Sequence, residues 1–231
     1  MNKTGISWTE LTWNPVSGCS KVSPGCQNCY AEAWSRRWKR SFEVTLHPEK
    51  LKEVRKIPAG SKVFVNSMSD LFHDKVPREF ILDIFKTIET RPDVIFQILT
   101  KRPENAGNWI IPENVWLGVS VELESFKKRI QQLHCIDPPS ITKFISFEPL
   151  LGDIGKVEFP YDVKWIIIGG ESGPHHRPMN IEWARNLIRQ AKEQAVAVWM
   201  KQLGGMRPGG ELEDFPNDLR IREFPQLEAP A

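Results

Sequence analysis

Short apolar runs alternate along the chain with stretches in which apolar residues recur at helical spacing. The apolar runs predict strands at 11–13, 62–66, 94–99, 115–121, 143–147, 164–168 and 197–200. The stretches between them predict helices at 31–40, 77–91, 124–136 and 180–195. A proline begins the second of these helices, and Asn180 caps the last. Continuous apolar strands separated by helices predict a parallel sheet that is covered on both faces.

The number of strand–helix units narrows the architecture. About six or seven units in 231 residues predict an α/β fold, a partial parallel (βα) barrel with a cysteine-containing loop after the first strand. A doubly wound open sheet is the alternative. We expect a single domain over residues 1–207. We expect a loose C-terminal tail over residues 208–231, because that segment is rich in Gly, Pro and acidic residues.

Polar, charged or small residues follow the predicted strands. In both architectures, ligands bind at the carboxyl ends of parallel strands. The segments at these ends are 19–29, 66–70, 100–102, 120–122, 146–148, 169–172 and 201–202. We therefore expect the functional site in these segments.

Three of the four cysteines, Cys19, Cys26 and Cys29, share one loop (residues 19–29, the cysteine loop) with the spacing C-x6-C-x2-C. So tight a group is more typical of a metal site than of a disulfide framework. Three thiolates fit a [4Fe–4S] cluster with one open iron. Zinc with a distant fourth ligand is an alternative, for which Cys135 and His134 are poorly placed in a predicted helix. Three reduced cysteines without metal are the remaining interpretation.

Several motifs resemble a phage-associated three-Cys-motif family and together span nearly the whole chain. They lie at 7–19, 24–32, 96–103, 117–122, 147–150 and 168–173. That family is similar in layout to radical S-adenosylmethionine enzymes, which carry a three-Cys loop after the first strand of a partial barrel. The usual spacing there is C-x3-C-x2-C, so the first gap is longer in this chain. The resemblance implies a [4Fe–4S] cluster on the three loop cysteines. It also implies that one electron from an external donor cleaves bound S-adenosylmethionine to a 5′-deoxyadenosyl radical.

The same resemblance implies where S-adenosylmethionine is held. Its amino group needs acceptors at the end of the second strand, and its ribose and carboxylate need polar groups from the middle strands. A cation such as Lys101 or Arg102 suits the carboxylate. The expected cofactor-binding residues are Tyr30, Ser67, Ser69, Asp70, Lys101, Ser120, Glu122, Gly169 and Gly170. The alternatives are solvated loop positions for the polar residues and a tight turn for the glycines.

Three acidic or basic residues at strand ends are candidates for catalysis. Glu148 follows a buried strand, where a carboxylate is costly unless it is paired or used. Lys201 occupies the same place on the last strand, so the two residues either form an ion pair in the barrel mouth or contact substrate. Glu171 follows the glycine pair, and the segment 175–177 (His-His-Arg) after it offers groups that bind an anion or donate a proton.

Basic and aromatic residues are interleaved in the predicted helix after the cysteine loop. They are Trp34, Arg36, Arg37, Trp38, Lys39 and Arg40. Such a mixture can bind nucleic acid by stacking and phosphate contact. A helix that packs its tryptophans and solvates its basic face has the same sequence, and we favour that interpretation.

Charge and hydropathy limit the class of protein. The net charge of +2 neither requires nor excludes a nucleic-acid partner. No apolar run approaches the roughly 20 residues of a membrane span, and the N-terminus has no apolar signal core, so we expect a cytoplasmic protein.

These observations lead to one hypothesis and two alternatives. The leading hypothesis is an iron–sulfur enzyme of the radical S-adenosylmethionine type with an unknown substrate, for which a nucleotide or nucleic acid is a reasonable guess. The first alternative is a nucleic-acid-binding or interaction protein with a structural metal on the cysteine loop. The second is a redox-inactive scaffold with free thiols. The sequence does not say whether a partner protein completes the site.

Overall fold

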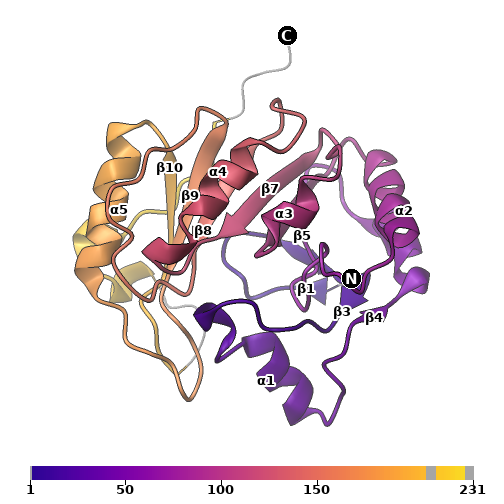
Figure 1. The fold of residues 1–231 in the computed structure, drawn as a ribbon, viewed down its shortest axis with the longest axis horizontal. Helices are drawn as coiled ribbons and strands as arrows, with labels where there is room; N and C mark the ends of the chain where they lie inside the picture. Colours follow the sequence, from indigo (N-terminus) through magenta and orange to yellow (C-terminus); the bar gives the residue numbers. More distant parts are fainter. Residues whose placement is uncertain (1, 207–211, 227–231) are drawn as a thin grey trace.

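One eight-stranded sheet organises the chain in the computed structural model, which describes residues 2–206 and 212–226 (Figure 1). Strand β1 (Asn2–Lys3) is antiparallel to its neighbour at one edge. The other seven strands are parallel, and their order in the sheet is their order in the sequence. They are β2 (Leu11–Trp13), β5 (Lys62–Val65), β6 (Ile95–Thr100), β7 (Val115–Ser120), β8 (Lys143–Phe147), β9 (Val163–Gly169) and β10 (Ala197–Gln202).

The sequential strand order distinguishes the two predicted architectures. A doubly wound sheet reverses its strand order at a switch point, and the described parallel strands show no reversal. Each new strand is instead added on the same side of the previous one, which lets a twisted sheet curl toward a barrel. The prediction of a partial (βα) barrel is confirmed, and the doubly wound alternative is wrong.

Helices lie along the curved sheet, with one exception. The helices on the sheet are α2 (Arg78–Glu89), α3 (Pro103–Ala106), α4 (Lys128–His134) and α5 (Ile181–Glu193). Figure 1 shows α1 (Tyr30–Arg37) apart from them, at the lower edge of the view. Among residues 2–206 and 212–226, no helix has the length and apolar character needed to cross a bilayer.

Alternation along the strands divides the apolar side chains between two cores. The larger core joins one face of the sheet to the helices, for example through Ile98 of β6 and Ile84 of α2, both fully buried. The smaller core lies on the other face, toward the amino ends of the strands, and is mainly aromatic. Its fully or nearly fully buried members are Trp8, Phe64, Trp116, Phe144, Trp165, Ile167 and Trp199. We call this second core the aromatic floor.

Most element boundaries agree with the sequence analysis, since the predicted strands differ from the observed ones by at most two residues at an end. The predicted helix at 124–136 is divided into a 3₁₀ turn, η3 (Glu124–Phe126), and α4. Helix α5 begins where Asn180 accepts a hydrogen bond from the Glu182 amide, as its capping role requires. The sequence analysis missed the short antiparallel pair β3 (Val16–Ser17) and β4 (Thr45–Leu46), and also η2 (Pro48–Lys56).

The C-terminal segment packs against the sheet where it is described. Residues 207–211 and 227–231, which include the predicted boundary at 207–208 and the end of the predicted tail, lie outside the described residues. Over 212–226, Phe215 and Leu219 are buried, and the Met200 amide of β10 donates to the Ile221 carbonyl at 2.8 Å. This part of the predicted loose tail is therefore docked, because its few apolar residues cover the edge of the sheet.

Candidate active site

The cysteine loop crosses the carboxyl end of the sheet. It follows β3, and the preceding Gly18 pairs with Ser69 in the segment after β5, with its amide 3.0 Å from the Met68 carbonyl. Cys26 ends a short 3₁₀ turn, and Cys29 lies immediately before helix α1. All three loop cysteines are free thiols and partly exposed. The loop is thus at the edge where the sheet topology predicts a ligand.

Arg102, at the end of β6, joins the first cysteine to the sheet. Its side chain is almost fully buried, and one terminal nitrogen lies 3.6 Å from the Cys19 sulfur and 3.1 Å from an Asp70 oxygen. The other terminal nitrogen donates to the carbonyl and hydroxyl oxygens of Ser20 at 3.1 and 3.0 Å. Burial and the negative charge of Asp70 raise the pKa of the Cys19 thiol, while Arg102 acts in the opposite direction.

Asp70 itself is fully engaged by the protein. Its buried carboxylate accepts hydrogen bonds from the Thr100 hydroxyl at 2.8 Å, from the Phe72 and Lys101 amides at 3.1 and 3.0 Å, and from Arg102. These bonds use both oxygens. Asp70 therefore fixes the orientation of Arg102 and the end of β6 toward the loop.

Glu122, after β7, is the central anchor of the loop. Its carboxylate is completely buried and lies 2.5 Å from the Lys101 ammonium, 2.6 Å from the Ser23 hydroxyl and 2.9 Å from Arg129 of α4. Burial opposes ionisation, but these partners outweigh it and lower the pKa of Glu122. Gly25 rests directly on this carboxylate, since a Cβ there would lie 2.5 Å from a Glu122 oxygen.

The second loop cysteine lies beside the same cation. The Lys101 ammonium is 3.8 Å from the Cys26 sulfur. Burial raises the pKa of the Cys26 thiol, but the Lys101 charge and hydrogen bonds from the loop outweigh it, and the net effect lowers the pKa. A cation at this distance favours the thiolate, which is the form that binds metals.

A third set of contacts, made by residues that follow β9, holds the cysteine loop. Glu171 and Arg177 form an ion pair at 2.5 Å, and the Glu171 carboxylate also accepts from the Asn28 side chain at 2.9 Å. Arg177 donates to the Pro24 carbonyl at 2.9 Å. Burial alone would raise the pKa of Glu171, but hydrogen bonds from Arg177 and Asn28 lower it. Glu171, predicted as a catalytic residue, is bonded to the base of the cysteine loop.

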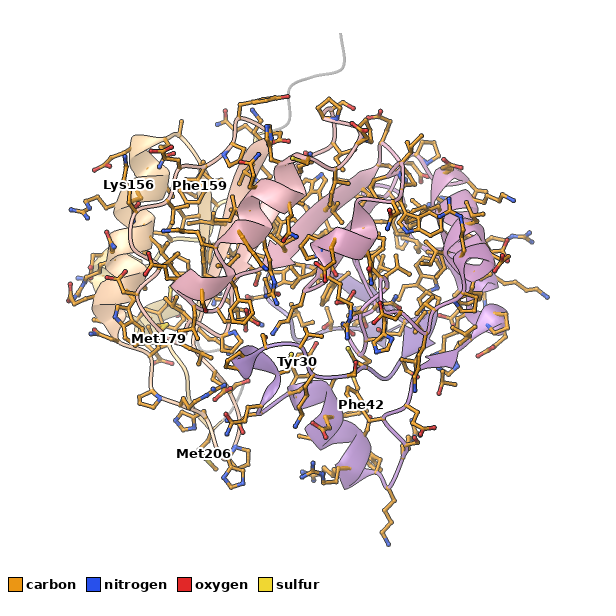
Figure 2. All side chains as sticks on the ribbon, in the orientation of Figure 1. Tyr30, Phe42, Lys156, Phe159, Met179 and Met206 are labelled. Atoms are coloured by element: carbon orange, nitrogen blue, oxygen red, sulfur yellow. The ribbon has the colours of Figure 1, made fainter. Side chains whose placement is uncertain are left out.

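Three rim residues, Tyr30, Glu148 and Lys201, remain outside this anchoring network. Glu148 and Lys201 form the ion pair considered in the sequence analysis, with 2.5 Å between charged atoms and both side chains partly exposed. The Tyr30 hydroxyl donates to the Ser67 carbonyl, and Figure 2 shows Tyr30 at the inner end of α1. Desolvation, then the charges of Cys29 and Glu148, raise the pKa of the Tyr30 phenol, although half of its side chain is accessible to water.

Three other predicted cofactor residues, Ser67, Ser69 and Ser120, form hydrogen bonds within the chain. The Ser67 and Ser69 hydroxyls donate to Asn14 at 3.1 Å and to the Val16 carbonyl at 2.9 Å. Ser120 is buried, and its carbonyl accepts from Arg129 at 2.8 Å.

The two glycines after β9 are both sites of close approach. A Cβ on Gly169 would lie 3.1 Å from the Glu148 carboxyl carbon, and one on Gly170 would lie 2.3 Å from the Leu203 carbonyl. Gly170 therefore serves the contact between β9 and the chain after β10, whereas Gly169 borders Glu148.

The structure separates the cysteine loop from the fourth cysteine. Cys135 ends α4, next to His134, whose ring lies 2.9 Å from Asp162 just before β9. Because Asp162 is at the amino end of its strand, Cys135 and His134 lie at the opposite end of the sheet from the loop. Within residues 2–206 and 212–226, no three or more His, Cys, Asp or Glu side chains are arranged to chelate a single metal ion.

The anchoring partners of the loop were the part that sequence reasoning missed. Ser23, Asn28 and Arg129 were not singled out, and neither was the close contact of Gly25 with Glu122. Gly25 follows Pro24 in the sequence, and only the buried carboxylate below it reveals why glycine is needed there. Arg129 lies inside a helical pattern, where nothing local distinguishes it from a solvated basic residue.

Comparisons with known proteins agree with this architecture. Two solved structures share the fold at a TM-score of 0.51 and 9% sequence identity: spore photoproduct lyase complexed with dinucleoside spore photoproduct, and a cysteine-to-serine mutant of that lyase. Each match covers 83% of this chain and 63% of the lyase chain, so this chain spans less than two thirds of the lyase's length. At this identity the likeness shows the fold alone, a partial (βα) barrel.

The sequence itself gives one further match. No curated protein matches it. The family model described as "Protein of unknown function (DUF5131)" matches residues 3–218, and the chain therefore belongs to that family.

Proposed function

We propose that the protein is an iron–sulfur enzyme of the radical S-adenosylmethionine type, with Cys19, Cys26 and Cys29 as the ligands of a [4Fe–4S] cluster. The observation that most strongly supports this proposal is the position of the three thiols, which lie on one loop across the carboxyl ends of seven parallel strands. Cys135, at the opposite end of the sheet, is not available as a fourth ligand, which suits a cluster with one open iron.

The surroundings of the thiols fit such a cluster. Arg102 and Lys101 place positive charge 3.6 and 3.8 Å from two of the sulfurs, where it offsets the negative charge of thiolate ligands. The sulfurs are not arranged as a single-ion chelate. That agrees with a multi-iron cluster, in which each thiolate binds a different iron and the sulfurs lie further apart.

The bound group would supply the electron that cleaves S-adenosylmethionine to a 5′-deoxyadenosyl radical, after reduction by an external donor. The chain's own residues then divide into two sets. Asp70, Glu122 and Glu171 position the loop through Arg102, Lys101 and Arg177. We assign the cofactor and substrate side of the mouth to Tyr30, Glu148 and Lys201, because the loop does not use their polar groups.

The Glu148–Lys201 pair suits proton transfer or the binding of a charged substrate group. Each is the hydrogen-bond partner of the other, and both stay partly exposed, at 18% and 15% of the side chain. A substrate carboxylate or phosphate can therefore replace Glu148 at Lys201 without creating a buried unpaired charge. The dinucleoside bound by the structurally similar lyase supports a nucleotide-containing substrate.

The first experiment is anaerobic purification of the full chain, followed by iron and sulfide analysis and absorption spectra with S-adenosylmethionine and dithionite. We expect about four irons per chain, a broad band near 400 nm that bleaches on reduction, and release of 5′-deoxyadenosine. Iron without cleavage would retain the cluster and reject the radical chemistry. A colourless protein with one zinc per chain would reject both and favour a structural metal.

Single cysteine variants supply the matched control. Cys26→Ser is expected to lose most of the iron and the band near 400 nm. Cys135→Ser should keep both, because Cys135 is exposed at the opposite end of the sheet. Equal iron loss in the two variants would contradict the ligand assignment.

A further inference from the structure

Helix α1 leaves its tryptophans in water. Only Ala31 of its eight residues is buried, and Trp34 and Trp38 are 56% and 58% exposed. The two indole rings contact each other, with centroids 6.0 Å apart and planes tilted by 59°. The interpretation favoured from the sequence, a helix that packs its tryptophans, is therefore wrong. Two large apolar side chains are held together on a surface that no part of residues 2–206 and 212–226 covers.

The aromatic residues of α1 form a stripe that begins at the barrel mouth. Tyr30, Trp34 and Trp38 follow one another at intervals of four residues, which places them along one side of a helix. Tyr30 is at the inner end, tied to Ser67 after β5, and Figure 1 shows the rest of α1 extending away from the sheet. The stripe thus leads outward from the residues assigned to the mouth.

Positive charge is concentrated on the same segment. Residues 21–40 contain five basic residues and one acidic residue, so the remainder of the chain has a slight acidic excess. Lys21 and Arg36 both contact the one acidic residue, Glu32, at 3.1 and 3.4 Å. Arg37, Lys39 and Arg40 are exposed, and the described part of the chain offers them no ion pair. Their charges are available to a partner.

We infer that α1 and the three residues after its end bind single-stranded nucleic acid. The binding surface, which we call the α1 surface, comprises Trp34, Trp38, Arg37, Lys39 and Arg40. Exposed indoles stack on unpaired bases, and neighbouring cations bind the phosphates between them. A duplex keeps its bases stacked inside and offers the tryptophans no faces, so single strands suit this surface better. An acidic protein partner would match the charge but leave the paired indoles unexplained.

The α1 surface also indicates how a strand reaches the mouth. A strand stacked on Trp38 and Trp34 continues toward Tyr30 and the Glu148–Lys201 pair. That this strand carries the substrate rests on the proposed function, whereas binding to the α1 surface does not require the cluster.

The test is fluorescence anisotropy with the full chain purified anaerobically and labelled oligonucleotides of about 12 nucleotides, a length typical of such sites. Single-stranded DNA, single-stranded RNA and the matching DNA duplex are the three probes. We expect at least one single strand to bind more tightly than the duplex. Trp34→Ala and Trp38→Ala should each weaken binding about tenfold. Arg37→Ala with Arg40→Ala should reduce the slope of log affinity against log salt by about 1.4.

Controls remote from α1 make the result specific. Tyr161→Ala removes an aromatic ring that is 71% exposed, and Lys86→Ala removes an exposed cation on α2. Both should bind like the parent chain. The inference is overturned if no single strand binds, if the α1 variants bind like the controls, or if duplex binds equally well. It is also overturned if the tryptophans instead mediate self-association, or binding to vesicles of anionic lipid, that Trp34→Ala abolishes.

Iron content measured on the same samples keeps the two proposals apart. Binding without iron would support the α1 surface and reject the cluster. Iron and S-adenosylmethionine cleavage without oligonucleotide binding would support the cluster and reject the α1 surface.

Discussion

The inner face of the barrel is different at its two ends. At the amino ends of the strands it is the aromatic floor, where rings of Trp8, Phe64, Trp116 and Trp165 meet at centroid distances of 4.7–6.1 Å. At the carboxyl ends it is a rim of ionised side chains in which Glu122 and Arg129 are buried. One β-strand can contribute to both ends. In β10, Trp199 belongs to the aromatic floor, and Lys201, two residues later, belongs to the rim.

The two ends have different roles: the aromatic floor contributes stability, and the rim positions the groups of the candidate site. Aromatic burial at the floor stabilises the curled sheet with no charge to neutralise, and the indoles of Trp165 and Trp199 donate to the Glu223 carbonyl and the Ser7 hydroxyl. Each buried charge at the rim carries a desolvation cost that its partners must offset, so buried ion pairs contribute little net stability. Their role at the rim is to position the loop that carries the three cysteines. Substitutions at the two ends are therefore expected to fail in different ways.

The largest expected effect is at the floor. Trp165→Ala should lower the free energy of unfolding by about 3–5 kcal/mol, because Trp165 is fully buried and contacts Trp8, Trp116, Phe144 and Trp199. Urea denaturation followed by circular dichroism measures it. The iron content of the protein that remains folded should be unchanged. A Trp165→Ala variant that is stable but free of iron would mean that the aromatic floor takes part in the metal site, and would contradict the division of roles between floor and rim.

A smaller loss of stability, with loss of iron, is expected at the rim. Glu122→Gln keeps the size of the side chain but leaves Lys101 and Arg129 without their buried counter-charge. We expect a decrease of about 2–3 kcal/mol in the free energy of unfolding, and reduced iron content because Ser23 and Lys101 no longer hold the loop. Glu158→Gln is the matched control, since its ion pair with Lys156 is 83% exposed on both sides. It should change neither quantity. Full iron retention in Glu122→Gln would contradict the anchoring role.

The sequence predicts the floor better than the rim, and the reason is physical. Strand patterns depend on local alternation, so the positions of Trp165 in β9 and Trp199 in β10 follow from the chain itself. Which strand ends lie together follows from the parallel topology, and this is why the Glu148–Lys201 pair was foreseen. The contact between Glu122 and Arg129 was not foreseen, because Arg129 comes from a helix whose rotation about its axis no sequence pattern fixes.

The exposure of the α1 tryptophans is a second feature that the sequence pattern does not predict. Its helical pattern was recognised, but the exposure of Trp34 and Trp38 depends on how α1 leaves the loop and on whether another element covers it. Neither is encoded within the helix. The Glu171–Arg177 pair is intermediate: the strand end was identified, but the Asn28 contact that directs Glu171 toward the loop required the fold.

A pH-dependent effect is expected at the Glu171 contact. Hydrogen bonds from Arg177 and Asn28 hold the pKa of Glu171 below its usual 4.5 in the folded chain. The unfolded chain therefore binds the proton first as pH falls. The stabilisation is complete above pH 4.5 and is lost as pH decreases through the folded-state pKa. The difference in free energy of unfolding between the parent and Glu171→Gln should shrink over that interval. Its size at neutral pH should be less than for Glu122→Gln, because Arg177 is 31% exposed. A difference that grows at low pH would contradict the ion pair.

The smallest effect on stability is expected at the α1 tryptophans, which sharpens the contrast with the floor. Trp34→Ala with Trp38→Ala removes two indoles, yet more than half of each is already in water, and α1 buries only Ala31. The free energy of unfolding should change by less than about 1 kcal/mol, in contrast to Trp165→Ala, because little apolar surface leaves the core. Parallel urea denaturation of the two variants measures the ratio. A loss as large as that of Trp165→Ala would mean that the α1 tryptophans pack against the protein in solution, and would remove the surface on which a nucleic-acid strand is expected to stack.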